Sequence, residues 1–193
     1  GGINLSGGGG SSIMLNAGAG NVYLRGTNIS TLDNYLTGTR LFNTQITGAG
    51  VTLIGSGSSD ISGNHYGVWL DNSTISTTSG PITITGTGGS STGANNHGVK
   101  LSSAASVHAT SGQISITGTG GGSVSSSNND GVAFEGSGGS VYTTDSGTVT
   151  LTGTKGIGAN SEGIATNLAV GGTATLGHAS QTGNLNLAAS NLS

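Results

Sequence analysis

The chain has 193 residues, of which 40 are glycine and only 6% are charged, and its formal net charge is −3. Four Lys and Arg in total cannot neutralise a run of phosphates, so the composition argues against nucleic acid and against anionic membrane surfaces as partners. There is no cysteine, and no apolar run approaches the roughly 20 residues of a membrane-spanning helix, so we expect no disulfide and no membrane insertion.

The first 50 residues contain short alternating stretches that look like strands, at Ile3 and Leu5, Ile13 and Leu15, and Val22 and Leu24. Residues 26–50 fit the pattern of the later chain poorly. We therefore predict irregular or atypical first turns over residues 1–50.

Residues 51–166 repeat about every 32 residues. A Gly-Val or Gly-Ile tetrapeptide recurs at steps of 31, 33 and 32, starting at Gly67, Gly98, Gly131 and Gly163. A Thr-rich phrase recurs at steps of 31, 32 and 35, starting at Val51, Ile82, Ile114 and Val149. Such a period is typical of stacked repeats, in which each unit buries its apolar face against its neighbours.

Each repeat holds three short stretches of alternating, β-branched sequence, separated by Gly, Ser or Asn turns. In the first clear repeat, Val68 and Leu70 point inward, the second stretch is centred on Ile75, and Ile82 and Ile84 point inward in the third. No helical period is present. We predict an all-β fold, a right-handed parallel β-helix of about six turns with three strands per turn, whose equivalent strands pair at about 4.8 Å.

We predict one domain over residues 1–193, with clear repeats in 51–166 and a last, irregular turn in 167–193. Neither end carries an obvious polar or helical cap, which solenoids need for solubility. We therefore expect a piece of a longer rod, or an oligomer that covers its own ends.

One predicted corner carries two columns of turn residues: Asn64, Asn95, Asn128 and Asn160, and Gly67, Gly98, Gly131 and Gly163. Stacked asparagines bond amide to amide along the axis and tolerate left-handed backbone conformations. The glycines serve a positive φ or close packing at the same corner. We interpret both columns as structural.

Directly before three of these glycines stand His97, Asp130 and Glu162, which stacking would place about 4.8 Å apart. That spacing could seat a divalent ion. A metal site, however, needs ligands that converge from several directions, and a variable polar position on an exposed corner needs no such explanation. We predict no metal site and no cofactor.

The outer face of the first strand carries Trp69 and Asp71, one turn from Lys100 and two turns from Glu135. An exposed aromatic beside carboxylates is a common design for a sugar-binding surface. Asp71 and Glu135, at about 9.6 Å, stand near the upper limit for an inverting carboxylate pair. Surface decoration, carbohydrate binding and carbohydrate cleavage all remain open, and we predict no catalytic residue.

The outward positions of the third strand form a ladder of hydroxyl side chains: Thr83, Thr85, Ser115, Thr117, Thr150 and Thr152. Regular Thr ladders are what ice-binding β-solenoids expose. Thr is also a good outward strand residue, because stacked Thr pairs stabilise a sheet by themselves.

The phrases TISTTSGPITITGTG at residues 74–88 and SGQISITG at residues 111–118 resemble the strand repeats of filamentous-haemagglutinin-like bacterial surface proteins, the large exoproteins and adhesins. The resemblance covers about residues 50–166 and brings no catalytic or binding motif. It implies a right-handed β-helix that is secreted or displayed at the cell surface, where such rods support adhesion, cell contact or a sheath. The unit adds a loop, such as residues 89–96, to the shorter repeat usual in that family.

From these observations we expect a non-enzymatic structural or adhesive segment of an extracellular bacterial β-helix. Its partner is itself, by end-to-end or lateral association, or a glycan of a cell surface. Two alternatives stay open: a carbohydrate-binding or polysaccharide-cleaving β-helix, and an ice-binding β-solenoid that uses the Thr ladder.

Overall fold

The computed structural model of the chain describes residues 2–8, 10–29, 36–59, 61 and 63–191, which form strands and no helix. Accordingly, the described segments contain no helix with the length and apolarity to cross a membrane. The strands of this part of the chain are β1 (Ile3–Ser6), β2 (Ile13–Asn16), β3 (Asn21–Thr27), β4 (Thr39–Phe42), β5 (Thr44–Thr47), β6 (Gly50–Ser56), β7 (Val68–Asp71), β8 (Thr74–Thr77), β9 (Ile82–Thr87), β10 (Val99–Ser102), β11 (Ala105–Ala109), β12 (Ile114–Thr119), β13 (Val132–Thr143), β14 (Val149–Thr154), β15 (Ile164–Leu176) and β16 (Leu185–Ala189).

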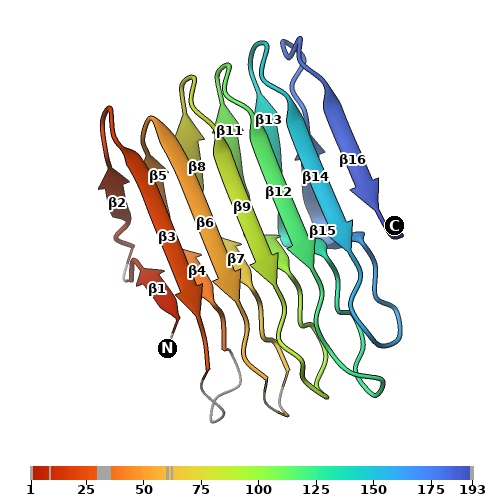
Figure 1. Ribbon diagram of the computed structural model, residues 1–193. Coiled ribbons are helices and arrows are strands. Elements are labelled where there is room, and N and C mark those ends of the chain that lie inside the picture. The colour runs from red at the N-terminus through yellow and green to blue at the C-terminus, as the bar shows by residue number, and fades with distance from the viewer. Residues whose placement is uncertain (1, 9, 30–35, 60, 62, 192–193) are drawn as a thin grey trace.

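The strands wind into a coil in which every strand pairs in parallel with its equivalent one turn away (Figure 1). One wall is the six-stranded sheet β3-β6-β9-β12-β14-β16. The first and second strands of each turn form the ten-stranded sheet, in which the long strands β13 and β15 run through both columns. The chain is a parallel β-solenoid of about six turns, so the predicted fold class is confirmed.

Strand pairing sets the length of each turn. Val68, Val99, Val132 and Ile164 are successive register partners, at steps of 31, 33 and 32 residues. The first 50 residues also form turns in register, because β1 pairs with β4 and β2 pairs with β5. Their irregularity lies in the length of the connections: Ile3 pairs with Thr39, 36 residues on, and Thr39 pairs with Val68, only 29 residues on.

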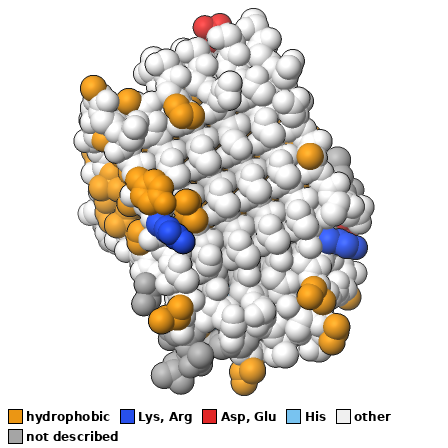
Figure 2. All heavy atoms as spheres, viewed as in Figure 1, with side chains coloured by type: hydrophobic (Ala, Val, Ile, Leu, Met, Phe, Trp, Pro, Cys, Tyr) orange, Lys and Arg blue, Asp and Glu red, His pale blue; other side chains and the backbone are white. Residues whose placement is uncertain are grey.

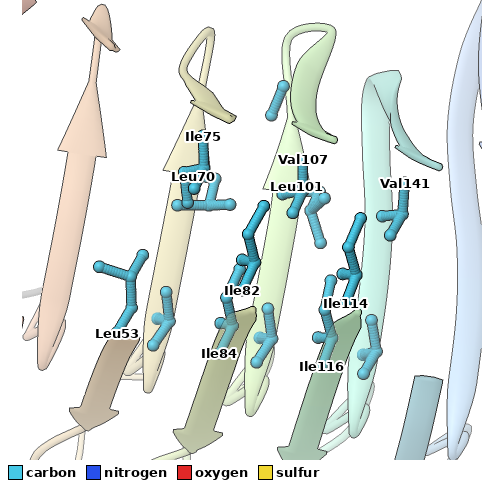
Figure 3. Close-up of a cluster of buried hydrophobic side chains, with 14 of the residues drawn as sticks. Leu53, Leu70, Ile75, Ile82, Ile84, Leu101, Val107, Ile114, Ile116 and Val141 are labelled. Carbon is cyan, nitrogen blue, oxygen red and sulfur yellow. The ribbon is translucent and has the colours of Figure 1, made fainter. Parts of the chain in front are cut away.

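Aliphatic side chains fill the interior, each lying on its equivalent in the next turn (Figure 3). The columns that point inward from the three strands are fully buried: Leu70, Leu101 and Phe134; Ile75, Val107 and Val141; Ile84, Ile116 and Leu151. Each such side chain contributes about 1.5–3 kcal/mol through burial. A narrow interior of this kind needs only a few apolar residues per turn, which is why a chain with 32% hydrophobic residues can fill it.

The coil closes where the end of the third strand lies against the start of the next first strand, with glycine facing glycine. A Cβ on Gly86 would lie 2.0 Å from the carbonyl oxygen of Gly98, and one on Gly98 would lie 2.3 Å from the backbone nitrogen of Thr119. No side chain fits at these distances. The same contact recurs in the other turns, in the pairs Gly55 and Gly67, Gly118 and Gly131, and Gly153 and Gly163.

We expect Gly86→Ala to lower the free energy of unfolding by about 1–3 kcal/mol, because the new methyl group must push two backbone segments apart. Gly8→Ala is the matched control, since a Cβ there meets no atom within 4 Å. Urea unfolding of both variants measures the difference. Equal midpoints for the two variants would show that the corner does not depend on a bare backbone.

Candidate functional site

The four surface residues singled out from the sequence lie together on the outer face of the ten-stranded sheet. Trp69 of β7 is the register partner of Lys100 of β10. In the neighbouring column, Asp71, Ser102 and Glu135 follow one another in successive turns. Ser102 therefore stands between the two carboxylates, and its hydroxyl lies 3.4 Å from Oδ1 of Asp71.

Trp69 is enclosed by its neighbours in the stack. The Arg40 guanidinium, one turn before it, lies 4.3 Å from the centre of the indole ring, and the Lys100 ammonium, one turn after it, lies 5.2 Å from it. The Tyr66 ring meets the indole edge to face at 5.2 Å, and the indole N–H donates to the Ser102 hydroxyl at 2.9 Å. The two cations approach from opposite turns, so a sugar would compete with them for the faces of the ring.

Lys100 and Glu135 form the ionic centre of this cluster. Nζ of Lys100 lies 2.5 Å from Oε2 of Glu135 and 3.3 Å from the Tyr66 hydroxyl. Oε1 of Glu135 lies 2.8 Å from Nε2 of His97, which is completely buried. The carboxylate is thus held between a cation on the surface and an imidazole beneath it.

These contacts shift the pKa values of the pair. Burial alone would raise the pKa of Glu135, but the hydrogen bond of His97, together with the Lys100 ammonium, outweighs it and lowers that pKa to about 2. Burial would lower the pKa of Lys100, but Tyr66 and Glu135 raise it above its ordinary value. The Glu135 carboxyl is therefore ionised at neutral pH.

The corner next to this face is buried, and the expectation of an exposed corner was wrong. Tyr66, His97 and Asp130 are all at most 2% exposed. The reason is that the loop of each turn folds back over the corner, where the Gly89 N–H, for example, donates to the carbonyl oxygen of His65. Only Glu162, in the next turn of this column, is partly exposed.

Hydrogen bonds tie this buried column together from turn to turn. Nδ1 of His97 accepts the Asp130 N–H at 3.1 Å, and Oδ1 of Asp130 accepts the Glu162 N–H at 2.8 Å. Because Nδ1 is an acceptor, the proton of a neutral His97 is assigned to Nε2, facing Glu135. Burial raises the pKa of Asp130, against the opposing effects of His97 and of the Glu162 N–H.

No three His, Cys, Asp or Glu side chains are placed to hold a metal ion in the part of the chain that the structure describes. His97, Asp130 and Glu135 are close to one another, and they contact each other, Lys100 and backbone N–H groups of the next turn. The column serves cohesion between turns.

The predicted asparagine column takes the left-handed conformation. Asn64, Asn95, Asn128 and Asn160 have φ between 52° and 62°. The Asn95 side-chain amide donates to that of Asn64 at 3.3 Å. Positive φ thus belongs to these asparagines, whereas the glycines three residues later allow the close approach of backbones described above.

A second, buried ladder lies one residue further on, and the sequence analysis did not single it out. The backbone N–H groups of His65, Asn96 and Asn129 donate to the side chains of Asn96, Asn129 and Ser161, respectively, each one turn ahead. The doublets Asn95-Asn96 and Asn128-Asn129 were the available signal. They show that two adjacent positions of the corner, and not one, favour amides.

A column of stacked rings on the outer face of the second strands was also missed. His108, Tyr142 and His178 lie in successive turns, with ring centres 5.3 Å and 5.5 Å apart. The alternation around Val107 and Val141 places His108 and Tyr142 outward, so the sequence held this signal. The rings face one another, so the column presents ring edges to solvent and stabilises the stack.

The predicted Thr ladder lies on the outer face of the six-stranded sheet. Thr83, Ser115 and Thr150 form one column in register, and Thr85, Thr117 and Thr152 form the next. Figure 2 shows this wall from the front as regular rows of uncharged side chains, with hydrophobic and charged side chains towards its margins.

No family model matches the chain, and no curated protein and no solved structure matches it either.

We expect Glu135→Gln to lower the free energy of unfolding at pH 7 by about 3 kcal/mol, because it removes a carboxylate with a depressed pKa and leaves Lys100 buried without its ion pair. The folded-state pKa of about 2 lies below the ordinary 4.5. The contribution of Glu135 is therefore complete above pH 4.5 and is lost as the pH falls towards 2.

Thermal unfolding between pH 2 and pH 7 measures this effect, with Asp145→Asn as the control, since Asp145 is exposed. The difference between Glu135→Gln and the unsubstituted chain should shrink as the pH falls. A difference that stays constant with pH would show that Glu135 is not held by these charges.

Proposed function

We propose that the chain is a structural segment of an extracellular β-solenoid rod, which associates end to end with further solenoid turns and performs no catalysis. The observation that carries this proposal is the character of the two ends of the coil: both present unpaired strand edges and apolar side chains, with almost no charge.

At the first turn, the outer edges of β1, β2 and β3 pair with no other strand in the described residues. Leu5, Leu15, Val22 and Leu24 are only partly buried and continue the inward columns. An open hollow of about 350 Å³ is lined here by Leu15, Val22 and Leu24 together with Tyr23, which is 60% exposed. This end offers an apolar surface that ends in free backbone N–H and C=O groups.

The last turn likewise presents apolar side chains at the other end of the coil. Leu168, Ala174 and Leu176 of β15 pack against the core but are only partly buried. Leu185 and Leu187 of β16 lie in register with inward residues of β14, yet they are 42% and 43% exposed. A further turn placed on this end would bury them as the other turns bury their equivalents.

Charged side chains, which normally protect exposed strand edges from pairing, are almost absent from the strands at the two ends, where Arg25 of β3 is the exception. Residues 1–24 and 164–193 contain no Lys, Arg, Asp or Glu. Parallel pairing has the same hydrogen-bond pattern at every turn, so the last turn of one copy presents the surface on which the first turn of a second copy can stack. The surface at each end therefore suits another solenoid turn, which in the purified chain a second copy can supply.

The resemblance of residues 50–166 to filamentous-haemagglutinin-like surface proteins supports the extracellular setting of the proposal. So does the absence of cysteine-dependent chemistry and of a basic surface, which leaves shape and stacking as the properties available for function. In such a setting the rod supports attachment or contact at a cell surface.

We expect the purified chain to form linear oligomers whose length grows with concentration, visible by electron microscopy and measurable by light scattering. Leu187→Lys should weaken this association, because it places an ammonium group in the inward column where the next turn would bury it. Asn186→Lys is the matched control: it adds the same charge on the same strand, but in the outward column.

A chain that stays monomeric at every concentration contradicts end-to-end stacking. Oligomers that Leu187→Lys and Asn186→Lys weaken equally would point to lateral association through the walls.

A further inference from the structure

The outer face of β6, β9, β12 and β14 carries three columns of hydroxyl side chains, one more than the sequence analysis identified. The columns are Thr52, Thr83, Ser115 and Thr150; Thr85, Thr117 and Thr152; and Ser56, Thr87, Thr119 and Thr154. In β6, the position of the second column is occupied by Ile54, the register partner of Thr85. The third column follows from the recurring Thr-Gly-Thr at the end of each third strand.

The array is regular in two directions. No register shift occurs between β6, β9, β12 and β14, so the hydroxyls repeat at about 4.8 Å from turn to turn and at about 6.6 Å along each strand. Figure 2 shows the resulting rows across this wall. Ordered groups of this kind can match a partner that is itself periodic.

The array is also rigid. The inward residues beneath it, such as Ile84, Ile116 and Leu151, are fully buried. Most members of the array are Thr, which is β-branched, so few χ1 rotamers are open to their hydroxyl and methyl groups. Binding of a partner here therefore costs little conformational entropy, because the surface is already ordered.

The hydroxyls of the array are not used inside the protein. In the described part of the chain, none of these Thr and Ser side chains forms a hydrogen bond with another protein group. The residues of the second column are half-buried, whereas Thr87, Thr119 and Thr154 are exposed. Their donors and acceptors are directed to the solvent.

We propose that this face binds ice. Ice is a periodic lattice of hydrogen-bond donors and acceptors whose oxygen spacings are of the same order as those of the array. The hydroxyls anchor water molecules at fixed points, and the methyl groups between them exclude disordered water. The three turns of β9, β12 and β14 place no charge and no aromatic ring in the array, which favours a water lattice over a polysaccharide, since sugar surfaces are usually bound through rings.

This site is separate from the ends of the coil on which the proposed structural function depends. The complete array is also limited in extent. In β3 the places of the first two columns hold Tyr23 and Arg25, and only the third column continues, in Thr27; in β16 the places of the first two columns hold Asn186 and Ala188. The array therefore spans four turns. We expect shaping of ice crystals and inhibition of their recrystallisation, rather than a large depression of the freezing point.

The test uses the chain carrying Leu187→Lys, so that end-to-end assembly does not contribute, and compares it with the same chain carrying Thr117→Tyr. Tyr at the centre of the array stays compatible with a strand but breaks the flat lattice. Ser76→Tyr is the matched control, because Ser76 is an equally half-buried outward residue on β8 of the other sheet. Circular dichroism checks that all three proteins remain folded.

The measurement is the fraction of protein taken up by slowly growing polycrystalline ice, together with the shape of single crystals. We expect uptake by the reference chain and by Ser76→Tyr, and an about tenfold loss for Thr117→Tyr, equivalent to a loss of about 1.4 kcal/mol of binding free energy. Exclusion of the reference chain from ice, or equal uptake of Thr117→Tyr, would overturn the proposal. Loss of binding to an insoluble crystalline polysaccharide by Thr117→Tyr, without ice uptake by any variant, would assign the face to carbohydrate instead.

Discussion

The whole structure depends on each residue lying directly on its equivalent one turn away, at the parallel strand spacing of about 4.8 Å. The interior is continuous where the inward positions stay apolar from turn to turn, as Ile84, Ile116 and Leu151 do. The stack also needs a corner at which backbone meets backbone. Gly86 and Gly98 provide it, since no side chain fits between them. Each turn must therefore keep both its apolar inward residues and its glycines at the corner if it is to stack on the next.

The same stacking explains why the few charged residues gather. A charged side chain on a wall is held one turn from its neighbours and must find its partner there, so Lys100 pairs with Glu135 and covers Trp69 together with Arg40. These contacts run perpendicular to the strands. They join four consecutive turns through side chains, in addition to the backbone ladder, and the cost of burying the Glu135 carboxylate is offset by His97 and Lys100. The cluster holds consecutive turns together through their side chains.

The walls and the ends of the coil differ in which groups they leave without a partner in the protein. Backbone groups on the walls are paired with the turns above and below, and only side chains such as Thr117 face outward. At the ends, backbone edges and apolar residues such as Leu187 are both exposed. A periodic hydroxyl wall and an apolar end with little charge suit different partners, so the assembly and the ice binding that we propose would use separate surfaces.

The sequence alone determined the fold, because in a solenoid the period is itself the tertiary contact: Val68, Val99 and Val132 are equivalent in the sequence and adjacent in space. It also determined the outward position of Trp69, Lys100 and Thr117, which follows from alternation along a strand. It could not place the first turns, where loops of unequal length hide the register, nor show that His97 and Asp130 are buried. Burial at the corner depends on how loops fold back over it, and the pairing of Glu135 with His97 joins a strand position to a corner position that only the closed cross-section brings together.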